Sequence, residues 1–79
     1  MGKINFGHKT GENLKYSVYS PSGTEREADV ELPESPVGSS RYIAVSTVVQ
    51  HGDDVIVKND SDTVVGHGEY LEDGWLKNG

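Results

Sequence analysis

The 79-residue sequence contains no cysteine, and it contains one tryptophan, one phenylalanine and one methionine. Without cysteine the chain can form neither a disulfide nor a zinc site built on thiolates. A single domain of this length buries only about 60–65% of the surface of its unfolded chain, which leaves a small margin of stability. We therefore expect one domain with a modest core of aliphatic residues and tyrosines.

Long apolar runs are also missing. No run approaches the roughly 20 residues of a membrane-spanning helix, and Met1–Phe6 lacks the apolar stretch of a signal peptide. The formal net charge is −6, and an acidic surface repels phosphate groups. We expect a protein that is cytoplasmic as synthesised and that binds neither nucleic acid nor membranes.

Apolar and polar residues alternate along several short segments that turn residues separate. A period of two is typical of strands with one face in a core and the other in solvent. Four residues on the apolar side are predicted to share one core, namely Val30, Leu32, Val55 and Val57. The predicted strands cover Lys3–Phe6, Asn13–Tyr19, Arg26–Leu32, Arg41–Val48, Asp54–Lys58 and Thr63–Tyr70.

Turn residues mark the connections between these strands. Ser20–Gly23, with proline second and glycine fourth, suits a type I turn, and Asn59–Asp62 suits a four-residue hairpin loop. Gly66 and Gly68 indicate a bulge or a close backbone approach within the last strand. Pro33–Ser40 holds two prolines and three serines, so we expect few of its backbone donors to join a sheet and expect it to be the most mobile internal segment. This spacing of strands favours a sandwich or a small barrel.

Histidines and aspartates are the candidate metal ligands. His8, His51 and His67 are dispersed, and folding would have to bring them together beside Asp53 to form a transition-metal site. A calcium site would need carboxylates to gather at one end of the sandwich, and the candidates are Asp53, Asp54, Asp60 and Asp62. Both patterns agree better with exposed histidines and turn-forming aspartates. No nucleophile elbow or phosphate-binding loop is present, so we expect no metal, no cofactor and no enzymatic activity.

Aromatic residues that we expect to be exposed give the better lead to function. Tyr19 lies on the polar side of its strand, and the C-terminal region holds further aromatic and aliphatic residues. Tryptophan and tyrosine are enriched at interaction hot spots. The predicted partner-binding residues are Tyr19, Tyr70, Leu71, Trp75 and Leu76. Trp75 could alternatively fold back and close the core of the domain.

The order of motifs resembles small immunoglobulin-like β-sandwich modules encoded among phage and prophage structural genes. The resemblance covers about Leu14 to Tyr70. It rests on the Leu14–Tyr19 strand before Ser20–Gly23, on Val30–Glu34, on Arg41–Ala44 after Gly38, on Gly52–Val57 and on Val65–Tyr70. It implies an all-β, immunoglobulin-like sandwich of six or seven antiparallel strands over residues 1–70. The last nine residues, 71–79, are expected to form a flexible tail.

The resemblance also implies a non-enzymatic structural or protein-interaction module, associated with a virion, that binds a partner protein or copies of itself. An alternative is a carbohydrate- or ligand-binding accessory module. In that alternative, Tyr19, Tyr70 and Trp75 would form a stacking platform.

Overall fold

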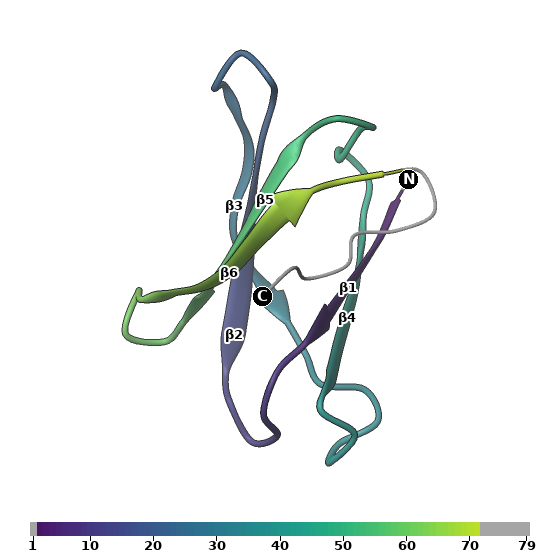
Figure 1. Cartoon of the computed structure of the whole chain (residues 1–79), viewed down its shortest axis with the longest axis vertical. Helices are drawn as coiled ribbons and strands as arrows, with labels where there is room; N and C mark the ends of the chain where they lie inside the picture. Colours follow the sequence, from purple (N-terminus) through teal and green to yellow (C-terminus); the bar gives the residue numbers. More distant parts are fainter. Residues whose placement is uncertain (1, 72–79) are drawn as a thin grey trace.

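The computed structural model describes residues 2–71, which form six strands in two sheets (Figure 1). Every paired strand is antiparallel to its neighbour. The predicted all-β sandwich of six strands is therefore confirmed, whereas its immunoglobulin-like connectivity stays a prediction. The strands are β1 (Gly2–Gly7), β2 (Leu14–Tyr19), β3 (Glu25–Leu32), β4 (Arg41–Ser46), β5 (Asp54–Asn59) and β6 (Val64–Glu69).

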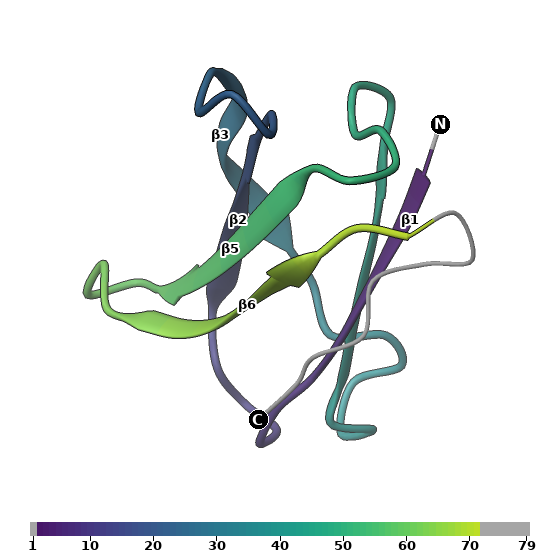
Figure 2. The same ribbon diagram turned by 45° about the horizontal axis from the view of Figure 1, so that its top comes forward.

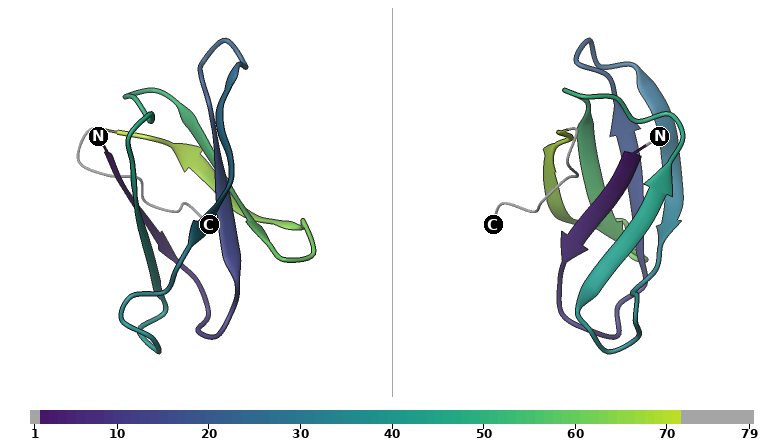
Figure 3. Two further views of the ribbon diagram at one scale, coloured as in Figure 1. Left: turned by 180° about the vertical axis from the view of Figure 1, so that it is seen from behind. Right: turned by 90° about the vertical axis from the view of Figure 1, so that its right-hand side faces the viewer.

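The larger sheet has the strand order β3-β2-β5-β6, and the smaller sheet consists of β1 and β4. Figure 2 shows the larger sheet as a strongly twisted layer. In the right panel of Figure 3, β1 and β4 lie side by side in front of the larger sheet. Each sheet thus has an inner face toward the other sheet and an outer face toward solvent. Within residues 2–71, no helix is long and apolar enough to cross a membrane.

The core lies between the two inner faces. Leu32, Val55 and Val57 are buried in it, and Val30 packs against it from a half-buried position. The predicted sharing of one core by these four residues is confirmed. Among residues 2–71, the other buried apolar residues are Ile4, Phe6, Leu14, Tyr16, Val18, Tyr42, Val49 and Tyr70.

Two glycines allow the sheets to approach closely. A Cβ atom on Gly66 would collide with the ring of Phe6, which connects β6 to β1. A Cβ atom on Gly2 would collide with the Tyr70 side chain and with Val49. The register of β5 against β6 also shifts between Val57 and Lys58. Gly66 and Gly68 predicted either a bulge or a close approach in this strand, and both features are found next to Gly66.

The tight turns follow their local sequence. The Gly23 N–H donates to the carbonyl of Ser20 at 2.8 Å, as in the predicted type I turn. In the hairpin between β5 and β6, Oδ1 of Asn59 accepts from the N–H groups of Ser61 and Thr63. Short polar side chains therefore satisfy the backbone donors of these turns.

The 33–40 connection forms hydrogen bonds both to β4 and within itself. The Ser35 N–H donates to the carbonyl of Arg41 at 2.8 Å, and the Ser39 N–H donates to that of Pro36 at 3.0 Å. Glu34 forms an isolated bridge to Tyr42. The Ser35 N–H thus joins residues 33–35 to the edge of β4, whereas the Ser39 N–H bonds within the connection, and the mobility of the segment stays a prediction.

Candidate interaction surfaces

Tyr19 is half-buried on the outer face of the larger sheet. Its hydroxyl donates to Oε1 of Glu25, 3.3 Å away on the neighbouring strand β3. On the other side, Tyr19 pairs with Asp54 of β5. The predicted contact residue therefore belongs to a surface with acidic neighbours.

Tyr70 lies in the core, with 5% of its surface exposed. Its N–H donates to the carbonyl of Asp53, and its own carbonyl accepts from the Gly52 N–H. This pairing holds the ring against Gly2 and Val49. The expectation of an exposed aromatic at position 70 is wrong, because the absence of a side chain at Gly2 makes room for the ring.

Leu71 is 46% exposed and follows directly after Tyr70. Its exposure agrees with the position expected of a contact residue, and its contact role stays a prediction. Trp75 and Leu76 lie outside the described residues, as does nearly all of the predicted 71–79 tail.

The histidines take three different positions. His8 stacks on Phe6 with the ring centroids 5.7 Å apart, whereas His51 is exposed in a turn and His67 is exposed on β6. Across residues 2–71, no three His, Asp or Glu side chains gather in a way that could hold a metal ion. The structure therefore does not bring these candidate ligands together within the described residues.

Of the four aspartates considered for calcium, Asp54 and Asp60 are exposed, and Asp53 and Asp62 are engaged in separate contacts. Oδ2 of the fully buried Asp53 accepts from the Gln50 N–H at 2.9 Å and lies 2.7 Å from Nε of Arg26. Asp62 forms an ion pair with Lys15 at the far end of β2, and Lys15 also approaches Asp29. The hydrogen bond from Lys15 lowers the pKa of Asp62 and raises that of the Lys15 ammonium. The Asp53 carboxylate therefore stabilises a buried turn, and the Asp62 carboxylate forms an ion pair at the surface.

The structure reveals an acidic row across the outer face of the larger sheet. Glu25 pairs with Tyr19, Tyr19 with Asp54, and Asp54 with Glu69, so one residue from each strand contributes. The three carboxylate residues are exposed. Within residues 2–71, neither Asp54 nor Glu69 has a cationic partner, although like charges directly opposite each other are unfavourable. We call Glu25, Tyr19, Asp54 and Glu69 the acidic row.

An open depression of about 170 Å³ adjoins the acidic row. Asp54, Ile56, His67 and Gly68 line it. Ile56 is half-buried and provides an apolar floor, and the exposed His67 pairs directly with it on β6. The outer face of the larger sheet thus combines an apolar hollow with an acidic rim.

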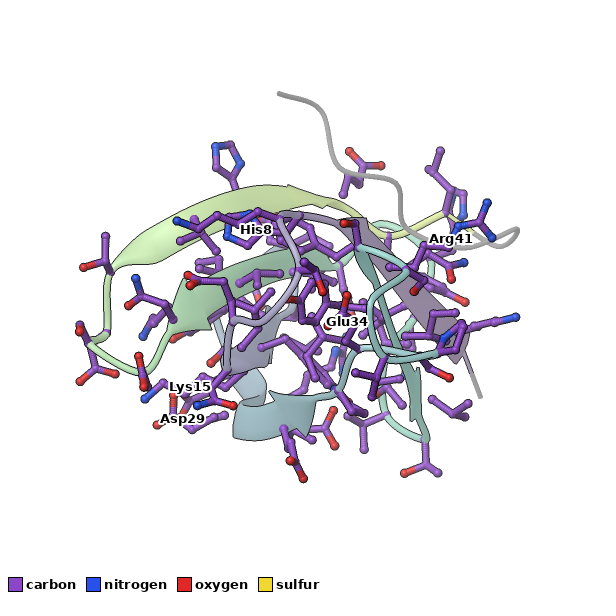
Figure 4. The ribbon with its side chains drawn as sticks, turned by 90° about the horizontal axis from the view of Figure 1, so that it is seen from below. His8, Lys15, Asp29, Glu34 and Arg41 are labelled. Carbon is purple, nitrogen blue, oxygen red and sulfur yellow. The ribbon has the colours of Figure 1, made fainter. Side chains whose placement is uncertain are left out.

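The outer face of the smaller sheet has the opposite charge. Lys3 of β1 and Arg41 of β4 are exposed, and neither strand contains an acidic residue. Val45 is 59% exposed and pairs directly with Lys3, while the half-buried Ile43 lies between Val45 and Arg41. We call Lys3, Arg41, Ile43 and Val45 the basic face. Figure 4 shows Arg41 on the opposite side of the molecule from Lys15 and Asp29.

Glu34 lies along the edge of β4, where it bridges to Tyr42, and its carboxylate accepts hydrogen bonds from two loops. Its Oε2 accepts from the Ser40 N–H at 2.8 Å, and its Oε1 accepts from the Gly11 N–H at 3.3 Å. A hydrogen bond from Thr10, together with these backbone donors, lowers the pKa of the Glu34 carboxyl. Figure 4, which views the molecule from below, shows Glu34 among the loops at the lower end of Figure 1.

Sequence reasoning found Tyr19 but missed the acidic row and the basic face. Alternation assigns each residue to a face of its own strand, but it does not say which residues of other strands lie beside it. Comparison with models of protein families, with curated proteins and with solved structures finds no significant match.

Proposed function

We propose that the chain is a non-enzymatic protein-interaction module. The observation that carries the proposal is the pair of unlike outer faces. One face exposes aliphatic side chains beside Lys3 and Arg41, and the other has an apolar hollow beside the acidic row. Apolar contact surrounded by complementary charge is typical of specific protein–protein recognition.

The finer part of the proposal is that the module is a component of a phage or prophage particle. It is supported by the resemblance over Leu14 to Tyr70 and by the small all-β fold that the resemblance implies. We expect mass spectrometry of purified particles from the source organism to detect the chain in a fixed ratio to the main structural protein. If the chain is absent from the particles, the particle assignment is wrong, and the chain would be an interaction module that acts outside a particle.

The carbohydrate-binding alternative loses part of its basis. It needed Tyr19, Tyr70 and Trp75 as stacking surfaces, and Tyr70 is buried in the core. Trp75 lies outside the described residues. Tyr19 is thus the one member of the platform that the structure places on a surface.

Site-specific photo-crosslinking tests the interaction module. A photoreactive amino acid is placed at Val45 on the basic face or at His67 beside the hollow, and the full chain is expressed in the source organism. Val37, which is 91% exposed in the 33–40 loop, is the matched control. We expect discrete protein adducts from positions 45 and 67 but not from position 37. Equal labelling at all three positions, or no adduct at any of them, would contradict the proposal.

A further inference from the structure

The spacing of charges on the two outer faces is similar. Lys3 and Arg41 are separated by four residues along a strand and by one strand spacing across the sheet, which is roughly 14 Å. Glu25 and Glu69 are separated by three strand spacings, which is also roughly 14 Å. The two cations of the basic face can therefore lie over opposite ends of the acidic row at the same time.

The apolar parts of the two faces also correspond. Val45 lies directly beside Lys3, Ile43 lies between the two cations, and the Ile56 hollow adjoins the middle of the acidic row at Asp54. An exposed valine beside Lys3 can enter a hollow whose rim is acidic. Burying such a side chain provides free energy that surface charges alone rarely supply.

We propose that copies of this chain associate head to tail, the basic face of one copy lying on the acidic row of the next. The inference rests on the proposed function and names a second copy as the partner. A second copy is chosen because one chain carries both halves of the match. In this arrangement Val45 enters the Ile56 hollow, Lys3 lies near Asp54 and Glu69, and Arg41 lies near Glu25.

The two faces in this contact are different, so each pair of copies leaves one face of each kind free. Such a heterologous contact adds further copies and produces rings or open stacks, whereas a two-fold contact would stop at a dimer. The net charge of −6 on each copy opposes association at long range. At physiological salt this repulsion is screened beyond about 8 Å, while close ion pairs persist. We therefore expect stacking at physiological salt and at high protein concentration.

The proposal is tested by reversing the charges of the basic face in one variant and those of the acidic row in another, and then mixing the two variants. The basic-face variant is Lys3→Glu/Arg41→Glu, and the acidic-row variant is Asp54→Lys/Glu69→Lys. Sedimentation velocity of the purified full chain at physiological salt measures association, and circular dichroism verifies folding. We expect the wild-type mass to rise beyond a dimer with concentration. Each variant alone should associate roughly tenfold or more weakly.

An equimolar mixture of the two variants should regain association, because each altered face then meets a face of opposite charge. Lys9→Glu is the matched control, since Lys9 is an exposed loop lysine outside both faces, and it should associate like the wild type. Should one double variant fail to fold, Lys3→Glu paired with Asp54→Lys gives the same comparison. A wild type that is monomeric at all concentrations, or a mixture that stays monomeric, would overturn the proposal.

The crosslinking experiment separates this inference from the proposed function. An adduct of two copies has twice the 8.6 kDa mass of the chain and supports stacking. Adducts of other masses, together with a monomeric purified chain, would retain the interaction module and overturn self-association. Without adducts at either face, both proposals fail.

Discussion

The Nε atom of Arg26 lies 2.7 Å from Oδ2 of Asp53, whose side chain is entirely shielded from solvent. Arg26 belongs to β3, and Asp53 precedes β5. The same carboxylate accepts from the Gln50 N–H, and the Asp53 carbonyl accepts from the Tyr70 N–H. Asp53 thus links an edge strand, a turn and the end of β6.

The first prediction concerns this ion pair. Arg26→Ala leaves a buried carboxylate without its cation and should lower the free energy of unfolding by about 3 kcal/mol. In an Asp53→Asn background the same change should cost under about 1 kcal/mol, because no buried charge remains. Denaturant unfolding of the four proteins measures both values. Arg41→Ala, an exposed arginine without an ion pair among residues 2–71, should stay within about 0.5 kcal/mol of wild type. Equal costs in both backgrounds would show that the pair is not coupled.

The second prediction concerns the close approach of β6 to Phe6. Gly66→Ala places a methyl group against the Phe6 ring and should destabilise the fold by about 1–3 kcal/mol through overpacking. Gly7→Ala is the control, since a Cβ atom there meets no neighbour within 4 Å. Thermal and denaturant unfolding compare the two variants. Similar midpoints for both would mean that the ring moves aside without cost.

The third prediction concerns the shared core. Val55→Ala removes two methyl groups from a fully buried position and should cost about 1–2.5 kcal/mol, scaled from larger aliphatic truncations. Val45→Ala removes the same atoms from the exposed basic face and should change stability by less than about 0.5 kcal/mol. Unfolding in denaturant gives the difference. An unchanged midpoint for the Val55 variant would contradict its core position.

The fourth prediction concerns Tyr16, which is buried beside Glu27 and Ser46. Burial of the hydroxyl raises the pKa of Tyr16 to about 12, and the Glu27 carboxylate adds to the rise. Because the ordinary pKa is about 10, the neutral hydroxyl favours the folded state. The contribution of the raised pKa to the free energy of unfolding is complete below about pH 10 and is lost as the pH rises toward 12.

Tyr16→Phe removes the titrating group and provides the comparison. The stability of the wild type relative to Tyr16→Phe should fall by about 1.4 kcal/mol between about pH 9 and pH 11. Denaturant unfolding at both pH values measures the change. A difference that is constant with pH would show that Tyr16 ionises in its usual range.

The sequence predicted local features well because they depend on neighbouring residues. Alternation located all six strands, and Ser20–Gly23 and Asn59–Asp62 specified their turns. The strand between Arg41 and Ser46 ends two residues earlier than expected, because Ser46 Oγ accepts from the N–H groups of Val48 and Val49 and turns the chain.

The remaining features depend on residues far apart in the chain. Tyr70 is buried because Gly2 makes room for it, and Arg26 reaches Asp53 across 27 positions of sequence. The acidic row depends on the register of four strands, which alternation alone does not specify. The sequence therefore indicated that a charged residue lies on the polar face of its own strand, but it did not indicate which residues of the adjacent strands lie beside that residue.

The last prediction concerns Glu34, which joins two loops through the N–H groups of Gly11 and Ser40. These hydrogen bonds, with one from Thr10, lower the pKa of the carboxyl, so their contribution is present above the ordinary pKa and is lost as the pH falls through the lowered value. Glu34→Gln should speed amide exchange at Ser40, because a neutral amide oxygen is a weaker acceptor than a carboxylate. Exchange at Ser35, which donates to the Arg41 carbonyl, should stay slower than at Val37 in both proteins. Nuclear magnetic resonance of the amide protons measures all three rates, and Glu31→Gln, an exposed glutamate on β3, is the control. Equally fast exchange at Ser35 and Val37 would instead support the sequence-based expectation that the whole 33–40 segment is mobile.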